Sequence, residues 1–188
     1  NEFEKTGEYK FIFGYEESIG YVAGDFVRDK DAVISSMLLC EAAAYYKTLG
    51  KSLIDVLNET YEELGYYREK LISVVLEGIE GQQRIERMME VYRKEFPKQI
   101  GKAKLIKYID LEEGKEYDLT SNTESDSEIP KSNVLKFILD DEAWYAVRPS
   151  GTEPKIKIMY SKAKTLEEAQ NKLKVMEKVI MGKLNSVE

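Results

Sequence analysis

AWYAVRPSGTEPKIKIMY, residues 143–160, joins two strand-like runs through a short polar loop. The run before the loop, 143–147, is apolar and rich in strand formers. In the run after it, 155–160, side chains alternate in character with a period of two, which is typical of a half-buried strand. The pattern predicts a strand–loop–strand unit that holds the loop at the end of a sheet, where binding loops are common.

The loop between these strands carries the groups that bind a phosphate dianion. The guanidinium of Arg148 offers a planar fork to two phosphate oxygens, and the hydroxyls of Ser150 and Thr152 donate to the others. Gly151 lets the backbone approach closely and turn its N–H groups inward. The same residue types also form ordinary surface turns, so the residues alone leave a phosphate site and a turn both open.

A second polar loop, GYEESIG at residues 14–20, follows the apolar run 11–13. Paired carboxylates suit a sugar because each carboxylate oxygen accepts a hydrogen bond from a hydroxyl group. Glu16, Glu17 and Ser18 are therefore candidates for sugar binding. For an isolated pair of glutamates a solvated turn is the simpler interpretation, but the strand-like run and the flanking glycines favour a binding loop.

Two cations stand just after this loop, at Arg28 and Lys30, near the predicted start of a helix. A positive charge is slightly unfavourable at a helix N-terminus. Surface charge is the simple interpretation, and an anionic partner such as a phosphate is the functional one.

Together the two loops resemble those of one enzyme family. RPSGTEPKIK, residues 148–157, is very similar to the phosphate-binding loop in the last domain of the α-D-phosphohexomutases, the phosphoglucomutase and phosphomannomutase family. GYEESIG is similar to the sugar-binding loop in that family's third domain, and with GDFVRDKD, residues 24–31, it looks most like the phosphoglucomutase branch that includes phosphopentomutases. The resemblance covers nearly the whole chain and weakens over 112–131, where we expect a variable loop.

The resemblance implies an intramolecular phosphoryl shift through a bisphosphosugar. The expected ligands are phosphosugars such as glucose 1-phosphate, glucose 6-phosphate and the 1,6-bisphosphate. Lys30 would have a supporting catalytic role, either stabilising charge on the transferring group or moving a proton. The residues implied to bind the substrate are Glu16, Glu17 and Ser18 for the sugar and Arg148, Ser150, Gly151 and Thr152 for the phosphate, with Arg28 and Lys155 as further candidates.

The family's phosphoserine loop and its Asp-rich magnesium loop have no match in this sequence. We therefore expect the C-terminal part of a four-domain enzyme, inactive alone, whose partners are the N-terminal domains of the same polypeptide. The parent enzyme would use Mg²⁺ with ligands outside this chain, and no metal ligand or cofactor is expected within it. The alternatives are a phosphomannomutase, a phosphopentomutase, or a non-catalytic phosphosugar-binding module.

Composition narrows the functional class further. A net charge of −7 over 188 residues argues against nucleic acid as a partner. No apolar run is long enough to cross a membrane, and the single cysteine cannot form an internal disulfide, which favours a cytoplasmic location. With no histidine, a Ser-His-Asp triad and a histidine-based zinc site are excluded from the chain.

The pattern of elements predicts an α+β protein of two parts. Residues 1–65 are expected to be the C-terminal part of the family's third domain, a partial α/β unit with the sugar-binding loop. Residues 66–188 are expected to be the phosphate-binding domain, a TATA-box-binding-protein-like antiparallel sheet with helices on one face. We expect strands at 10–14, 70–76, 104–109, 134–139, 142–147 and 155–160, helices at 30–48, 52–65, 82–96 and from 165 onward, and a mobile polar loop at 119–130.

Overall fold

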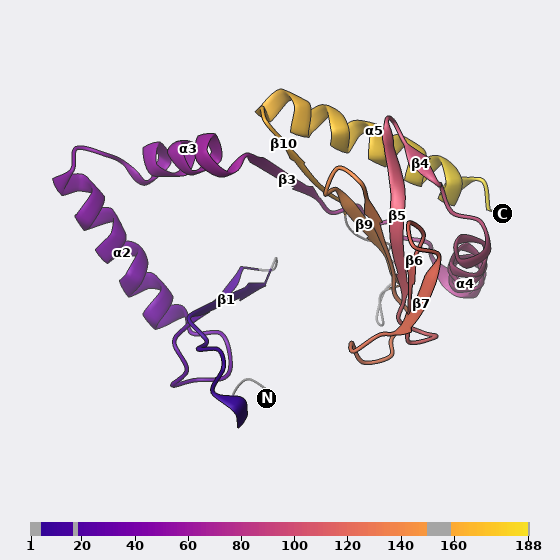
Figure 1. The fold of residues 1–188 in the computed structure, drawn as a ribbon, viewed down its shortest axis with the longest axis horizontal. Coiled ribbons are helices and arrows are strands. Elements are labelled where there is room, and N and C mark those ends of the chain that lie inside the picture. Colours follow the sequence, from indigo (N-terminus) through magenta and orange to yellow (C-terminus); the bar gives the residue numbers. More distant parts are fainter. Residues whose placement is uncertain (1–4, 17–18, 150–158, 188) are drawn as a thin grey trace. The chain divides into compact units, whose positions relative to one another are not determined.

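The computed structural model describes residues 5–16, 19–149 and 159–187, with backbone alone at 159 and 160. The chain divides into two compact units, residues 1–60 and 61–188. Each unit has its own sheet (Figure 1).

The first unit begins with an antiparallel hairpin. Strand β1, Phe13–Glu16, pairs with β2, Gly20–Ala23, and the register places Glu16 opposite Gly20. The expected strand at 10–14 thus starts and ends later, because pairing with β2 rather than apolar character sets its limits. Helices α2, Ala32–Thr48, and α3, Leu53–Leu64, follow as predicted.

Local capping explains where these two helices begin. The carboxylate of Asp31 accepts hydrogen bonds from the N–H groups of Val33 and Ile34 at 2.9 and 3.1 Å. Ser52 and Asp55 form a reciprocal capping pair: the Ser52 N–H donates to Asp55 at 2.8 Å, and the Asp55 N–H donates to the Ser52 hydroxyl at 3.2 Å. The Ser52 hydroxyl and backbone N–H lower the pKa of the Asp55 carboxyl, because both donate hydrogen bonds to its ionised form.

The first unit has almost no core of its own among its described residues. Gly20 is the one residue there that is buried. Large apolar side chains instead face outward, including Val33 at 82% exposure on α2 and Ile54 at 65% on α3. Such a surface is unusual for a stable isolated domain, because exposed apolar area of this extent normally packs against further protein.

The second unit is built on an antiparallel sheet with the strand order β3-β10-β9-β8-β5-β6-β7, and a short β4 pairs with β5. Sequence neighbours β8 and β9, where strands were predicted at 134–139 and 142–147, form a hairpin, and β10 pairs with both β9 and the distant β3. The strands are β3 Tyr66–Lys70, β4 Gln99–Ile100, β5 Ala103–Asp110, β6 Lys115–Asp118, β7 Thr123–Asp126, β8 Leu135–Leu139, β9 Trp144–Val147 and β10 Met159–Ala163.

Helices α4, Gly78–Lys94, and α5, Leu166–Asn185, pack against one face of this sheet (Figure 1). The expectation of an antiparallel sheet with helices on one face is therefore confirmed. The apolar face of α4 is buried, and so is that of α5 except for Leu166, which is 37% exposed in the first turn. The α5 N-terminus is capped by Thr165, since the Glu168 N–H donates to the Thr165 hydroxyl at 3.2 Å.

Aromatic rings run across the core face of the sheet. Phe137 on β8 is fully buried and stacks on Tyr145 of β9 with ring centroids 4.7 Å apart. Tyr108 on β5 lies 6.2 Å from Phe137 and stacks on Tyr117 of β6 at 4.4 Å. Tyr92 of α4 meets Phe137 edge-on at 5.7 Å. Because these rings join four strands to a helix, Phe137 sits at the centre of the packing that holds β8 and β9 together.

Two predictions about the second unit are wrong. The polar run 119–130, expected to be a mobile loop, contains the turn and strand β7 of the β6–β7 hairpin, where Lys115 on β6 reaches Glu124 and Asp126 on β7 at 3.1 and 2.9 Å. Those two carboxylates raise the pKa of the Lys115 ammonium. The strand expected at 70–76 instead lies at Tyr66–Lys70, where backbone pairing with β10 is available.

Candidate functional site

One hollow in the first unit contains three of the candidate residues. Glu16, Arg28 and Lys30 all line it, together with apolar and aromatic side chains of residues 9–15. Its volume, about 1440 Å³, is more than that of common small-molecule sites, which hold roughly 300–1,000 Å³. This concave surface has charged groups of both signs and an apolar wall. The charged groups suit the polar groups of a ligand, and the apolar wall suits a flat, weakly polar face of the same ligand.

Lys30 reaches the hollow because the start of α2 is anchored to the hairpin. The Asp31 N–H donates to the Tyr21 carbonyl on β2 at 2.8 Å, while the Asp31 side chain caps the helix. Ser35 adds a hydroxyl that donates to the Asp31 carbonyl at 2.6 Å. These short local bonds fix the backbone of Lys30 beside β2, so its side chain can extend across the hairpin.

The Lys30 ammonium donates to the Glu16 carboxylate, with Nζ and Oε2 3.2 Å apart. Both side chains remain about half exposed, at 50% and 51%. A pair this open to water contributes little stability, and a ligand can approach either charge. The sequence predicted both residues as candidates, and the structure shows that they are in contact.

Backbone strain marks the tip of the same hairpin. Ile19 has φ of 63°, in the left-handed region that β-branched residues rarely adopt. Its side chain is 82% exposed, so packing does not explain the conformation. Strain of this kind often occurs in binding loops. Glu17 and Ser18, the other sugar-binding candidates, lie outside the described residues.

Arg148 belongs to the second unit and follows the end of β9 directly. Burial alternates along β9, with Tyr145 and Val147 in the core, and Arg148 is exposed. The strand thus places the guanidinium in solvent at the start of the loop that the sequence predicts to bind phosphate. Ser150, Gly151, Thr152 and Lys155 lie outside the described residues, so their arrangement around Arg148 stays a prediction.

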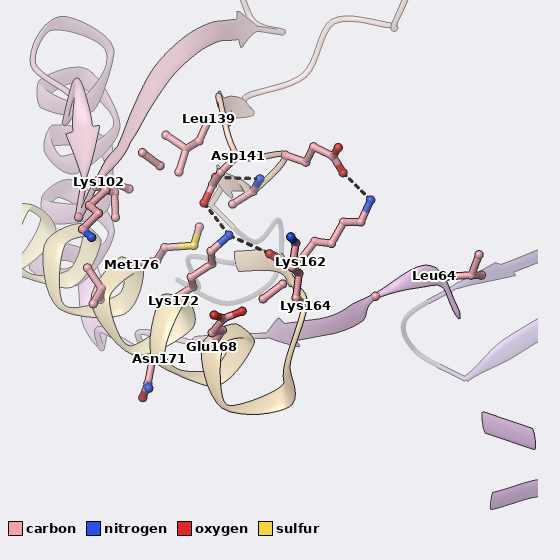
Figure 2. Close-up of a pocket in the computed structure, with 18 of the residues that line it drawn as sticks. Leu64, Lys102, Leu139, Asp141, Lys162, Lys164, Glu168, Asn171, Lys172 and Met176 are labelled. Carbon is pink, nitrogen blue, oxygen red and sulfur yellow. Dashed lines mark hydrogen bonds and ion pairs between the residues drawn. The ribbon is translucent and has the colours of Figure 1, made fainter. Parts of the chain in front are cut away.

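A second hollow, of about 1120 Å³, lies at the other end of β9, between the β8–β9 turn and α5 (Figure 2). Two of the four lysines that line it form ion pairs, Lys172 with Asp141 at 2.8 Å and Lys162 with Glu142 at 2.7 Å, and Lys102 and Lys164 are the other two. Hydrogen bonding to Glu142 raises the pKa of the Lys162 ammonium. A phosphate placed here would face these carboxylates, so this hollow is a poor phosphate site, and it contains none of the predicted binding residues.

Metal-binding side chains do not gather into clusters of three or more in the described part of the chain. Across 5–16, 19–149 and 159–187, no group of three or more carboxylate or thiol side chains gathers closely enough to hold a metal ion. Within the same residues, no helix combines the length and apolar character that crossing a membrane requires.

Family models match both units. Residues 2–64 match "Phosphoglucomutase/phosphomannomutase, alpha/beta/alpha domain III", and residues 107–178 match "Phosphoglucomutase/phosphomannomutase, C-terminal domain". Together these matches cover more than half of the chain, in the order in which the two loops occur. The chain belongs to the phosphoglucomutase/phosphomannomutase family and comprises domains of types III and IV.

Curated relatives named phosphoglucomutase are similar to most of this chain. The protein of Staphylococcus epidermidis is 44% identical over 154 residues, which are 82% of this chain and 28% of the relative. That of Staphylococcus haemolyticus is 45% identical over 151 residues, 80% of this chain and 27% of the relative. This chain therefore spans less than a third of the length of the relatives it matches.

A solved structure shows the same fold at low identity. The phosphoglucomutase pp63/parafusin from Paramecium, in its open form, superposes with a TM-score of 0.61 at 12% identity. The match covers 95% of this chain and 31% of that protein. At this identity the likeness supports the fold alone.

Proposed function

We propose that this chain is the substrate-binding C-terminal part of a phosphoglucomutase-type enzyme. The parent enzyme interconverts sugar 1-phosphate and sugar 6-phosphate through a bisphosphate intermediate in the cytoplasm. The observation that carries the proposal is the contact between Lys30 and Glu16 in the hollow of the domain III unit. In the domain IV unit, Arg148 directly follows β9, at the start of the loop predicted to bind phosphate. The names of the curated relatives support the same class.

Each described residue has a chemical task in this proposal. The Glu16 carboxylate accepts hydrogen bonds from sugar hydroxyls, and the Lys30 ammonium beside it stabilises negative charge on the phosphoryl group that moves. Arg148 holds the phosphate that does not react, through the two parallel N–H groups of its guanidinium. Phosphoryl transfer depends mainly on positioning and charge stabilisation, which are the contributions that such residues make.

The phosphoryl donor and the magnesium ion come from the N-terminal domains of the same polypeptide in this proposal. The exposed apolar side chains of α2 and α3 support such a partner, because they need a covering surface that the first unit does not supply. The 188-residue chain by itself is then inactive.

The test is an activity assay on the full-length enzyme. We expect rapid conversion of glucose 1-phosphate to glucose 6-phosphate, and no conversion by the 188-residue chain alone. Mannose 1-phosphate and ribose 1-phosphate, assayed in parallel, decide between the phosphoglucomutase and its phosphomannomutase and phosphopentomutase alternatives. If the full-length protein binds phosphosugars but converts none of them, the non-catalytic module is correct instead.

Glu16→Gln should weaken the sugar side of binding selectively. Losing one charged acceptor is expected to cost about 1–2 kcal/mol, or roughly 5- to 30-fold in the apparent affinity for glucose 1-phosphate. Competitive inhibition of the full-length enzyme by inorganic phosphate should stay unchanged, since phosphate has no sugar hydroxyls. An equal loss of affinity for inorganic phosphate would contradict the assignment of Glu16 to the sugar.

A further inference from the structure

Gly20 lacks the usual backbone reason for being a glycine. Several other glycines of this chain, such as Gly24 with φ of 76°, have positive φ angles that favour glycine, and Gly20 is not among them. It lies within strand β2, where alanine is conformationally acceptable, and it is buried. The reason for a glycine at this position therefore lies in the space next to its Cα atom, which a side chain would occupy.

That space is filled by the Lys30 side chain. A Cβ atom built on Gly20 would lie 2.7 Å from Cγ of Lys30 and still closer to Cδ, well inside van der Waals contact. The same Cβ would lie 3.5 Å from Oε2 of Glu16. Gly20 is also the register partner of Glu16, so the Lys30 stem crosses one strand at Gly20 to reach the carboxylate on the next.

We propose that Gly20 is a positioning residue whose bare Cα forms a slot for the Lys30 stem and thereby holds the ammonium against Glu16. The ion pair is half exposed, so by itself it would restrict the Lys30 side chain only weakly. The slot at Gly20 restricts this side chain further. The Asp31 anchor fixes one end of Lys30 and the slot fixes its middle. The effect of Gly20 on the rate of turnover rests on the proposed function, whereas its effect on the position of Lys30 does not.

Gly14, on the facing strand, offers a matched comparison. It also lacks a positive φ angle, and a Cβ there would meet the Phe11 ring no closer than 3.1 Å. A methyl group at Gly14 therefore displaces no part of Lys30, while it adds the same bulk to the same hairpin.

Zero-length crosslinking tests the placement of Lys30 without any assay of activity. A water-soluble carbodiimide joins a carboxylate to an amine in contact with it, so digestion of the full-length enzyme should yield a Glu16–Lys30 crosslinked peptide. Gly20→Ala is expected to lower its yield about tenfold, because reaction between neighbouring groups depends steeply on their separation. Gly14→Ala should keep the yield of the original protein. An unchanged yield in Gly20→Ala would overturn the proposal.

A double-mutant cycle tests the consequence for catalysis. In the full-length enzyme, Gly20→Ala should lower kcat/KM by about tenfold, since a misplacement of about 1 Å can have effects of this size or more. In a Lys30→Ala background there is no stem to displace, so adding Gly20→Ala should change nothing further. Losses that multiply in the double variant would show that Gly20 acts otherwise. If the full-length protein has no isomerase activity at all, the proposed function fails, and the crosslink still decides the role of Gly20.

Discussion

Arg148→Ala in the full-length enzyme is expected to weaken binding of glucose 1-phosphate by about 1–3 kcal/mol, or roughly 5- to 150-fold in Kd. The guanidinium follows the buried end of β9 and is exposed where the phosphate loop begins, so its removal deletes a charge-assisted contact without disturbing the core. Isothermal titration of glucose 1-phosphate into the variant measures the effect.

Lys174→Ala serves as the control for that experiment. It removes one positive charge from an exposed position on α5 and leaves the loop intact. Its Kd should match that of the unmodified enzyme. Equal weakening in both variants would mean that general electrostatic attraction, and not the geometry of Arg148, accounts for binding. An unchanged Kd for Arg148→Ala would remove Arg148 from the site.

Phe137→Ala is expected to destabilise the second unit by about 3–5 kcal/mol, the usual cost of deleting a buried phenylalanine ring. Phe137 is fully buried and contacts rings on two neighbouring strands and on α4, so nearby side chains cannot close the cavity easily. The loss is a large part of the roughly 5–15 kcal/mol that stabilises a typical domain. Urea denaturation followed by the fluorescence of Trp144, the single tryptophan, measures it.

Ile138→Ala is the matched control, because it removes a large apolar side chain from the next position on β8. Ile138 faces the other side of the sheet and is only partly buried. Ile138→Ala should lower the free energy of unfolding by less than half as much as Phe137→Ala does. Similar losses in the two variants would contradict the central role given to the aromatic stack.

The helices could be predicted from sequence because their signals are local. Asp31 bonds to N–H groups two and three residues away, and Thr165 bonds to one three residues away. Such contacts form within one turn, whatever the rest of the chain does. The apolar face of α4 can also be predicted from sequence, since its apolar residues recur with the 3.6-residue period of a helix. They therefore share one face before any tertiary contact exists.

The strands that were misplaced depend on distant partners. β3 exists where it does because residues 66–70 pair with 159–163, nearly a hundred residues later. The β6–β7 hairpin carries few apolar residues, and ion pairs across its strands take the place of an apolar signal. A polar run with such partners has the same composition as a loop, so periodicity cannot distinguish the two.

The sequence by itself determined which residue types are available: two loops whose side chains suit a phosphate and a sugar, in the order of one enzyme family, on capped helices and alternating strands. The tertiary structure decided which of those groups meet. Glu16 and Lys30 are fourteen residues apart, and their contact requires a hairpin register, an anchored helix start and an empty position at Gly20. The sequence specifies the residue types, but the path of the backbone decides which side chains are in contact. That path depends on pairing between distant segments.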